Sequence, residues 1–155
     1  HIDRPRTQYK RLSEYLIQNN IDPMKTTANQ VIDSVITLRT ELLPDPNIIP
    51  NAGSFFKNIY VNDTELKRLR KIDHKMPSFY EKDNSHKIPV AYILEKEGWK
   101  GKKEGCIGIS KQHALIVTTE EGSTYKDLIN FSKKIQQSIF IKYKIKLEIE
   151  PVEFR

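Results

Sequence analysis

The nine residues at positions 50–58, Pro-Asn-Ala-Gly-Ser-Phe-Phe-Lys-Asn, restrict the fold more than any other stretch of this chain. A proline and three small or turn-forming residues lead directly into a serine, two aromatic residues, a lysine and an asparagine. Gly53 and its neighbour Ala52 leave the backbone nearly bare, so a flat or bulky group can approach it closely. Ser54 adds a hydroxyl proton and Lys57 a cation. No other stretch is as dense in chemistry.

Aromatic and β-branched residues from Phe55 to Val61 predict a strand. Side chains alternate between the two faces of a strand, so this strand would divide the motif between two surfaces. Ser54, Phe56 and Asn58 would share one face, with Phe55 and Lys57 on the other.

The size of the chain predicts about one ordinary domain, because 155 residues are enough to bury most of the apolar surface without a metal or disulfides. Its one cysteine, Cys106, has no internal partner, which suits a reducing cytoplasm. No apolar run approaches the length of a membrane span and no signal peptide is visible, so we expect a cytoplasmic protein without membrane contact. The chain begins with His1 rather than methionine, which predicts a piece of something longer.

A net charge of +6 favours an anionic partner, such as a phosphorylated metabolite or a nucleic acid. The densest basic clusters, at residues 67–71 and 100–103, are short, and acidic residues are interleaved throughout. Solvated lysine-rich faces explain most of this charge, and no basic stretch interleaved with aromatic residues is visible. We therefore expect no nucleic-acid partner, while a basic nucleic-acid-binding module stays an alternative.

The N-terminal part of the sequence predicts a linker arm. Residues 1–25 carry few apolar side chains and predict one short helix. Thr26 or Thr27 can cap a second helix, whose apolar residues keep helical spacing from Val31 to Leu42 and which ends at Pro44. The sequence thus predicts a linker arm and helix over residues 1–43 and a domain over residues 44–155.

In that domain, the sequence predicts a basic helix capped by Asp63, then a loop from Pro77 to Ser85. A helix from Ile88 to Lys96 follows, stopped by Gly98, with Val90, Ile93 and Leu94 facing inward. Two short strands are expected at residues 105–109 and 114–118.

Thr124 and Asp127 form a capping-box pattern at the start of the longest predicted helix. Its apolar stripe is typical of a core face and consists of Leu128, Phe131, Ile135 and Ile139. Residues 145–150 then alternate apolar and charged side chains, which predicts a strand. Because helices and short mixed strands occur without a repeated βαβ unit, the predicted class is α+β.

Several motifs together resemble a known family. Pro44-Asp45-Pro46 and then residues 51–58 look like the signature of UDP-N-acetylenolpyruvoylglucosamine reductase, also called UDP-N-acetylmuramate dehydrogenase. Further matching motifs follow in order at residues 98–101 and 112–117, then in the long helix and the terminal segment. Taken alone, the opening motif is best explained as a turn followed by two core phenylalanines. The ordered motifs around it favour a site.

The resemblance implies an activity and two reacting residues. Members of the family reduce the enolpyruvyl ether of a UDP-sugar in bacterial peptidoglycan synthesis, with NADPH reducing FAD and the reduced flavin passing hydride to the alkene. The family's proton donor is a serine that falls on Ser54 here. An assisting glutamate falls on Glu150, while a register with one insertion would use Glu153, paired with Arg155.

The resemblance also implies residues that bind substrate or cofactor. A solvated lysine, a half-buried loop aromatic or a plain loop histidine are competing interpretations for several of them. Gly53 would approach the flavin, and the expected substrate contacts are Lys57, Asn58, Lys87, Lys100, Tyr80 and His113. His74, His86 and Cys106 lack metal-ligand spacing, so no metal is expected.

The chain departs from the family pattern at three places: Leu42 replaces a lysine, Ile59 replaces a proline, and Pro151 and Val152 follow Glu150 where the family has a valine and a basic residue. No glycine-rich flavin-binding segment is present, and in this family the FAD site lies mainly in the part that precedes residue 1. We therefore expect the chain to be the C-terminal substrate-binding part, inactive without a partner N-terminal FAD-binding part. A non-catalytic interaction domain that kept the fold is a further alternative.

Overall fold

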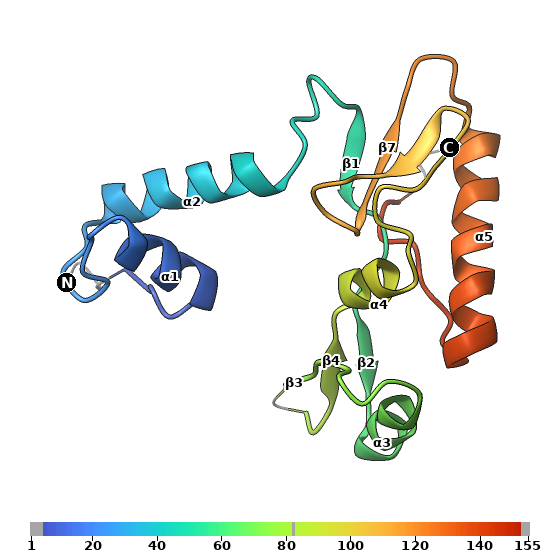
Figure 1. Cartoon of the computed structure of the whole chain (residues 1–155), viewed down its shortest axis with the longest axis horizontal. Helices are drawn as coiled ribbons and strands as arrows, with labels where there is room; N and C mark the ends of the chain where they lie inside the picture. The colour runs from blue at the N-terminus through green and yellow to red at the C-terminus, as the bar shows by residue number, and fades with distance from the viewer. Residues whose placement is uncertain (1–4, 82, 153–155) are drawn as a thin grey trace. The chain divides into compact units, whose positions relative to one another are not determined.

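The computed structural model describes residues 5–81 and 83–152. The chain separates into two compact units, His1–Pro44 and Asp45–Arg155 (Figure 1). The α+β class is confirmed: five helices and two antiparallel sheets occur in the described residues. None of the helices in these ranges is long and apolar enough to cross a bilayer.

The first unit contains two helices, α1 (Lys10–Gln18) and α2 (Ala28–Leu42). Leu12 and Leu16 of α1 are buried. Thr27 caps α2 in a capping box with Gln30, since each side chain accepts a hydrogen bond from the other residue's backbone amide. The two predicted helices and one of the two proposed caps are therefore confirmed.

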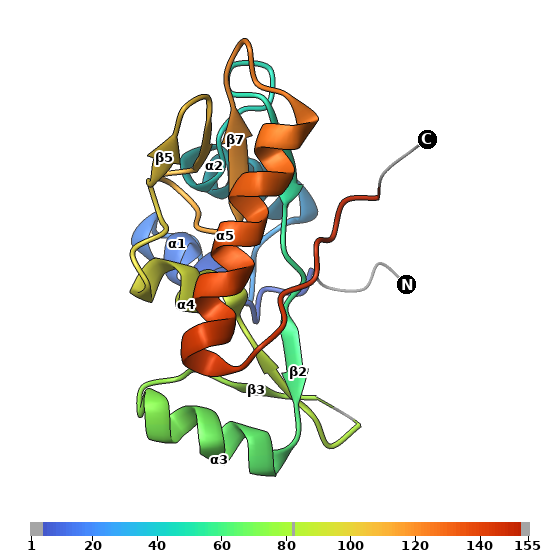
Figure 2. The ribbon, with the colours of Figure 1, turned by 90° about the vertical axis from the view of Figure 1, so that its right-hand side faces the viewer.

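The larger sheet of the second unit has the strand order β1-β7-β6-β5 and is antiparallel throughout. Its strands are β1 (Asn51–Ser54), β5 (Lys103–Glu104), β6 (Ile107–Ile109) and β7 (Ile116–Thr119). Helix α5 (Tyr125–Tyr143) lies across this sheet (Figure 2). Its capping box at Thr124 and Asp127 is confirmed.

The smaller sheet has the strand order β2-β4-β3. It consists of β2 (Ile59–Val61), β3 (Phe79–Tyr80) and β4 (His86–Ile88), and it is accompanied by α3 (Asp63–Ile72) and α4 (Val90–Lys96). Three predictions are wrong or only partly right here. The loop predicted from Pro77 to Ser85 contains strand β3. The cap of α3 is Asn62 rather than Asp63, because the Asn62 side chain accepts from the Glu65 amide. Ile88 ends a strand instead of starting a helix, since Pro89 intervenes as the N-cap of α4.

The predicted strand from Phe55 to Val61 forms only in its last three residues, as β2. Strand β1 ends before it and β2 begins only at Ile59, with Phe55 and Phe56 between them. Both phenylalanines are buried, and their rings meet edge to face at 5.1 Å. Two successive side chains in the core are incompatible with strand alternation, so the chain passes from one sheet to the other here.

The predicted strand at residues 145–150 forms only in part. Ile145 and Leu147 are buried while the charged residues between them are exposed, as the alternation requires. No ladder forms, and the segment makes a single bridge, between Ile149 and Phe56. Figure 2 shows this C-terminal segment running back beside the chain that joins β1 to β2.

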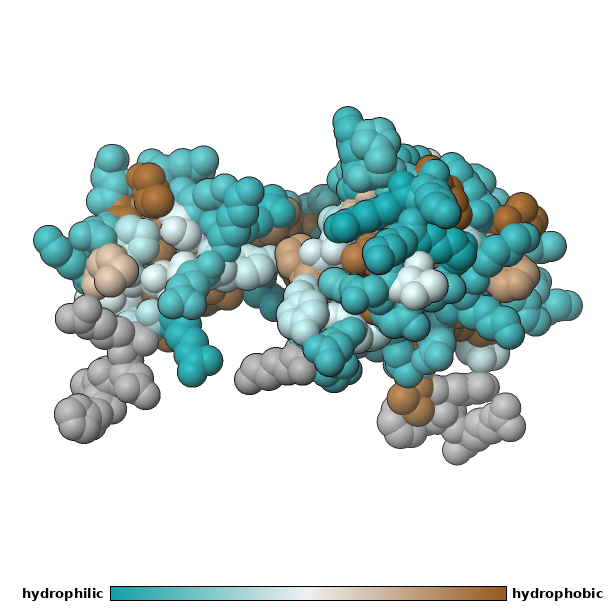
Figure 3. All heavy atoms as spheres, turned by 90° about the horizontal axis from the view of Figure 1, so that it is seen from below, coloured by the Kyte–Doolittle hydropathy of each residue, from teal (hydrophilic) through white to brown (hydrophobic). Residues whose placement is uncertain are grey.

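One core unites both sheets and the three helices of the second unit. Phe131, Ile135 and Ile139 of α5 are buried in it, as predicted, as are Val90, Ile93 and Leu94 of α4. Outside the core, the face seen from below is mostly hydrophilic, with hydrophobic residues in separate small areas (Figure 3). The interleaved charges of the sequence thus spread over the surface.

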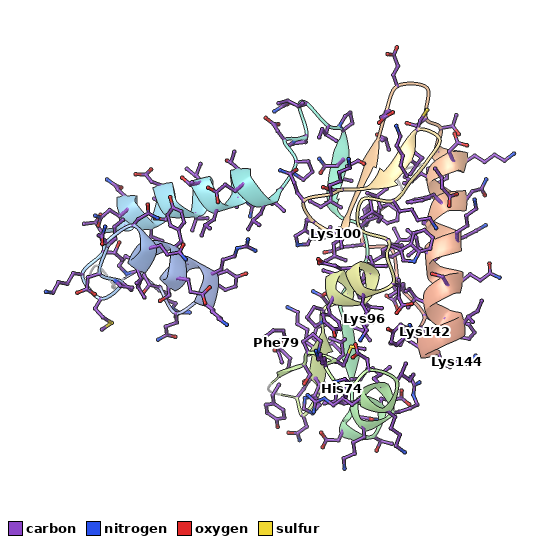
Figure 4. The ribbon with its side chains drawn as sticks, viewed as in Figure 1. His74, Phe79, Lys96, Lys100, Lys142 and Lys144 are labelled. Atoms are coloured by element: carbon purple, nitrogen blue, oxygen red, sulfur yellow. The ribbon has the colours of Figure 1, made fainter. Side chains whose placement is uncertain are left out.

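Asp73 is a buried carboxylate that joins the end of α3 to α4. The residue is 2% exposed, and its carboxylate accepts from the Lys96 ammonium at 2.6 Å and from the Tyr92 hydroxyl at 2.9 Å. Figure 4 labels Lys96 on α4. The hydrogen bond from Lys96 lowers the pKa of Asp73 from its ordinary value of 3.8, although burial acts in the opposite direction.

Replacing Asp73 by asparagine is expected to lower the free energy of unfolding by roughly 1.5–3 kcal/mol at neutral pH, the usual range for hydrogen bonds to charged groups. Because the pKa of Asp73 is lower in the folded than in the unfolded protein, its carboxylate stabilises the fold at pH values above the pKa of the unfolded state. This stabilisation is lost as the pH falls through the pKa of the folded state. Urea denaturation from pH ~5 to pH ~2 should therefore show the difference from wild type shrinking. Exposed Asp33→Asn is the control. A difference independent of pH would contradict this assignment.

Candidate functional site

Ser54 lies at the end of β1, beside a bulge. Asn51 pairs with Thr118 and Ser54 pairs with Ile116, so one extra residue is accommodated between these two pairs. Gly53 takes φ +74° in this bulge, a conformation that other residues adopt only with strain. The backbone turn places the Ser54 side chain on the surface.

The backbone of Glu150 is hydrogen-bonded to Phe55, the residue that follows Ser54. Its amide donates to the carbonyl of Phe55 at 2.9 Å, and the Lys57 amide donates to the carbonyl of Glu148 at 2.9 Å. On the opposite side, the Phe55 amide donates to the carbonyl of Leu115. The motif at residues 51–58 is therefore held between β7 and the C-terminal segment, and the backbone of Glu150 lies one residue away from Ser54 along this motif.

A surface hollow of about 590 Å³ lies beside this junction. It is lined by Lys57, Asn58, Ile59, Tyr60, Lys146, Glu148 and Glu150. Lys57 forms an ion pair with Glu148 at 3.2 Å, and both side chains are exposed. Such a surface pair contributes little to stability, so Lys57 can exchange it for an anionic ligand.

Asn58 has a structural partner. Its side-chain oxygen accepts from the Val90 amide at 3.2 Å, which satisfies a backbone donor at the start of α4. Because α4 begins at Val90, this contact fixes the helix against the wall of the hollow. Asn58 therefore joins the hollow to the core.

Two other predicted contacts are also engaged within the protein. The Lys100 ammonium forms an ion pair with Glu95 at 3.0 Å, and Figure 4 shows Lys100 just beyond α4. The ring of His113 accepts from the Leu115 amide at 3.2 Å through Nδ1. His113 thereby shapes the turn that leads to the strand pairing with Ser54, whereas Lys100 does not line the hollow.

Lys87 and Tyr80 lie in the smaller sheet and do not share a face. Tyr80 pairs with His86, and Lys87 pairs with Phe79 on one side and Tyr60 on the other. Since successive residues of a strand point to opposite faces, Tyr80 and Lys87 point apart. The structure therefore separates two of the predicted substrate contacts.

Two further residues of the hollow, Lys146 and Tyr60, were missed by the sequence reasoning. The alternation at residues 145–150 already placed Lys146 on the polar face with Glu148 and Glu150, which was the available signal. Within residues 5–81 and 83–152, no carboxylate forms an ion pair with Lys146, in contrast to Lys57. No linear pattern marked Tyr60.

The backbone around Gly53 is accessible. An ideal Cβ built on Gly53 meets no atom within 4 Å, so the backbone there is open to a flat group. In the described part of the chain no glycine-rich loop precedes a helix, an arrangement that binds cofactor phosphates in other proteins. The same residues contain no group of three histidine, cysteine or acidic side chains that could hold a metal. Glu153 and Arg155, the alternative pair, lie outside the described residues.

Comparison with known proteins gives a consistent set of relatives. The chain is 30% identical over 148 residues to the UDP-N-acetylenolpyruvoylglucosamine reductase of Burkholderia vietnamiensis, a match that covers 96% of this chain and 42% of the relative. It is 32% identical over 144 residues to the protein of the same name from Flavobacterium johnsoniae, covering 93% of this chain and 42% of that one. The chain thus spans less than half the length of these relatives.

The family comparison covers the second unit. Residues 45–154 match the family described as UDP-N-acetylenolpyruvoylglucosamine reductase, C-terminal domain. The match begins at the start of the Asp45–Arg155 unit and contains the bulge at Gly53, the hollow and the segment that carries Glu150. The chain therefore belongs to the family of UDP-N-acetylenolpyruvoylglucosamine reductase C-terminal domains.

Proposed function

We propose that this chain is the substrate-binding part of an enzyme that reduces UDP-N-acetylglucosamine enolpyruvate to UDP-N-acetylmuramate in bacterial peptidoglycan synthesis. The family membership and the names of the relatives support the reaction class. The observation that supports the proposal is the hydrogen bond from the Glu150 amide to the Phe55 carbonyl, which joins the backbone of Glu150 to the residue that follows Ser54. In this proposal the enzyme uses FAD and NADPH and works in the cytoplasm.

Ser54 is the proposed proton donor. Addition of hydride to the alkene leaves the adjacent carbon with enolate-like negative charge, and such a carbon is a strong base. A hydroxyl group is a weak acid, yet it suffices when it is well placed, because the acceptor is so basic. The exposed position of Ser54 leaves its hydroxyl open to a substrate on the surface of this unit.

Glu150 is the proposed assistant of Ser54. Its exposed carboxylate can orient a water or the substrate next to the donor, since the two backbones are joined through Phe55. Lys57, Asn58 and Lys146 line the hollow beside it and offer two ammonium groups and an amide to the anionic and amide groups of a nucleotide sugar. The hollow also carries the carboxylates of Glu148 and Glu150, and it is thus suited to a polar ligand whose anionic groups meet Lys57 and Lys146.

Bound FAD would supply the hydride in this proposal. The open backbone at Gly53 supports one contact of this chain with the flavin, and the remaining contacts would come from a preceding FAD-binding part. In this interpretation α1 and α2 belong to the arm at the end of that part. Lys87, Lys100, Tyr80 and His113 remain proposed substrate contacts, with Lys100 and His113 also engaged in the internal contacts described above.

The proposal is tested by joining the chain to a FAD-binding part from a relative and measuring NADPH oxidation. Oxidation is expected only when the enolpyruvyl UDP-sugar is present. The 155-residue chain by itself is expected to hold no flavin and to show no turnover. Robust turnover by the chain alone would contradict the assignment of FAD binding to a preceding part. NADPH oxidation that does not depend on the sugar would contradict the proposed function.

A further inference from the structure

Basic side chains gather on the exposed side of α3 and in the turn that follows it. Lys67, Arg70 and Lys71 of α3 and Lys75 of the turn are all exposed, and we call these four residues the basic face. Residues three and four apart are neighbours on a helix surface, so Arg70 and Lys71 both lie next to Lys67. Figure 4 labels His74 in the same turn, at the end of the helix.

The two acidic residues of α3 do not neutralise the basic face. Asp63 lies four residues before Lys67, which is the usual spacing of an ion pair on a helix, but its carboxylate is bonded to the ring of His86 at 2.7 Å. Glu65 forms an ion pair with Arg68 at 2.8 Å. Both carboxylates are therefore engaged with side chains outside the basic face.

The rest of the described chain does not neutralise this face either. Within residues 5–81 and 83–152, none of its four side chains forms an ion pair, and the hydrogen bond from Arg70 to the Ser78 hydroxyl joins it to a neutral partner. Asp73 is the only acidic residue between positions 66 and 80, and it is buried and paired with Lys96. Like charges at this helical spacing repel each other, so the fold contains a repulsion that its own carboxylates do not relieve.

The end of the helix accounts for part of this charge. Arg70 and Lys71 stand in the last turn of α3, where cations interact favourably with the helix dipole. That interaction falls off within one turn, so it does not account for Lys67. Lys75 lies beyond Ile72, the last helical residue. The basic face therefore has an excess of positive charge that the stability of α3 does not explain.

The spacing and composition of the basic face favour an extended acidic peptide as its ligand. Lys67 and Lys71 are about 6 Å apart along the helix axis. Alternate side chains of an extended chain are about 6.6 Å apart on one side, so two carboxylates can meet the two lysines. Single-stranded nucleic acids stack their bases on aromatic rings, and residues 63–75 contain no Phe, Tyr or Trp. A helix that lies on a membrane buries an apolar face, whereas Ile72 is the one exposed large apolar residue in the described segment 63–75.

We propose that the basic face binds an extended, carboxylate-rich segment of a partner protein, a contact separate from the reduction proposed above. In this complex Lys67 and Lys71 each meet a carboxylate of the segment, and Lys75 extends the contact past the end of α3. Opposite charges steer such an encounter, so binding depends strongly on salt concentration.

The test is fluorescence anisotropy of a labelled peptide of alternating glutamate and threonine, titrated with the 155-residue chain at low salt. Lys67→Gln/Lys71→Gln is expected to weaken peptide binding by about ten-fold, since each lost contact is worth roughly three-fold, and to reduce its salt dependence. Lys67→Arg/Lys71→Arg keeps both charges and should bind like the wild type. Lys126→Gln/Lys133→Gln, at two exposed lysines of α5, changes the net charge equally and should leave binding unchanged.

Equal weakening in the two glutamine variants would overturn the proposed face, because net charge alone would then explain the binding. The absence of saturable binding by the wild type would overturn it as well. A higher affinity for phosphatidylglycerol vesicles or for a single-stranded oligonucleotide than for the acidic peptide would overturn the choice of partner. Urea denaturation verifies that each variant is folded. None of these readouts involves NADPH oxidation, so the proposed reduction is judged separately.

Discussion

Replacing Phe56 by alanine is expected to lower the free energy of unfolding of the Asp45–Arg155 unit by roughly 3–5 kcal/mol, the range for truncating a buried phenylalanine. Phe56 is completely buried, its ring packs against that of Phe55, and its backbone bridges Ile149. Removing the ring leaves a cavity where three segments meet: the end of β1, the start of β2 and the C-terminal segment. The surrounding core cannot fill such a cavity without moving one of them.

Urea denaturation followed by far-ultraviolet circular dichroism measures this loss. Phe140→Ala is the matched control, because Phe140 lies on α5 but is 42% exposed, and the expected loss there is below about 1 kcal/mol. Similar losses for the two variants would mean that Phe56 has no special part in joining the segments. A large loss confined to Phe56 would identify it as the anchor of the site.

The burial of Phe55 and Phe56 also explains why the site could be predicted only in part. The resemblance pointed to Ser54 in residues 51–58 and to Glu150 in the terminal segment, and the Glu150 backbone is hydrogen-bonded to Phe55, the residue after Ser54. Periodicity alone suggested a strand from Phe55 to Val61, because aromatic and β-branched residues favour strands. Tertiary packing overrides that preference, since both phenylalanines enter the core.

The helices were more predictable than the strands. The capping boxes at Thr27 and Thr124 are local patterns whose partners lie three residues away, so the sequence contains the whole interaction. The short strands β3 and β5 consist of two residues each and depend on partners elsewhere in the chain. Such strands carry no periodic signal of their own.

The smaller sheet shows the same limit. Strand pairing places Lys87 between Tyr60 and Phe79, although the three residues are far apart in the sequence. The register also places Tyr80, the aromatic residue that the resemblance suggested, on the opposite face from Lys87. The register of a strand decides which of two adjacent aromatic residues lies on a given face. A shift of one residue moves every side chain of the strand to the opposite face.

The second large effect is expected at Ser54. Ser54→Ala removes only a hydroxyl group at an exposed position, so folding and substrate affinity should change little. If the hydroxyl is the proton donor, the turnover number should fall by roughly 10²–10⁴-fold, the usual contribution of a positioned general acid. Ser54→Cys, which keeps an ionisable proton at the same position, should recover part of that loss. Ser123→Ala, in the turn before α5, is the control.

Single-turnover reduction tests the central claim most directly. The joined protein, with its flavin reduced beforehand, is mixed with the enolpyruvyl UDP-sugar, and the reduced sugar is quantified by mass spectrometry over time. The account predicts that product formation slows by at least about 10²-fold in Ser54→Ala, partly recovers in Ser54→Cys, and is unchanged in Ser123→Ala. Product formation by Ser54→Ala at the wild-type rate would show that the proton comes from another group and would contradict the account.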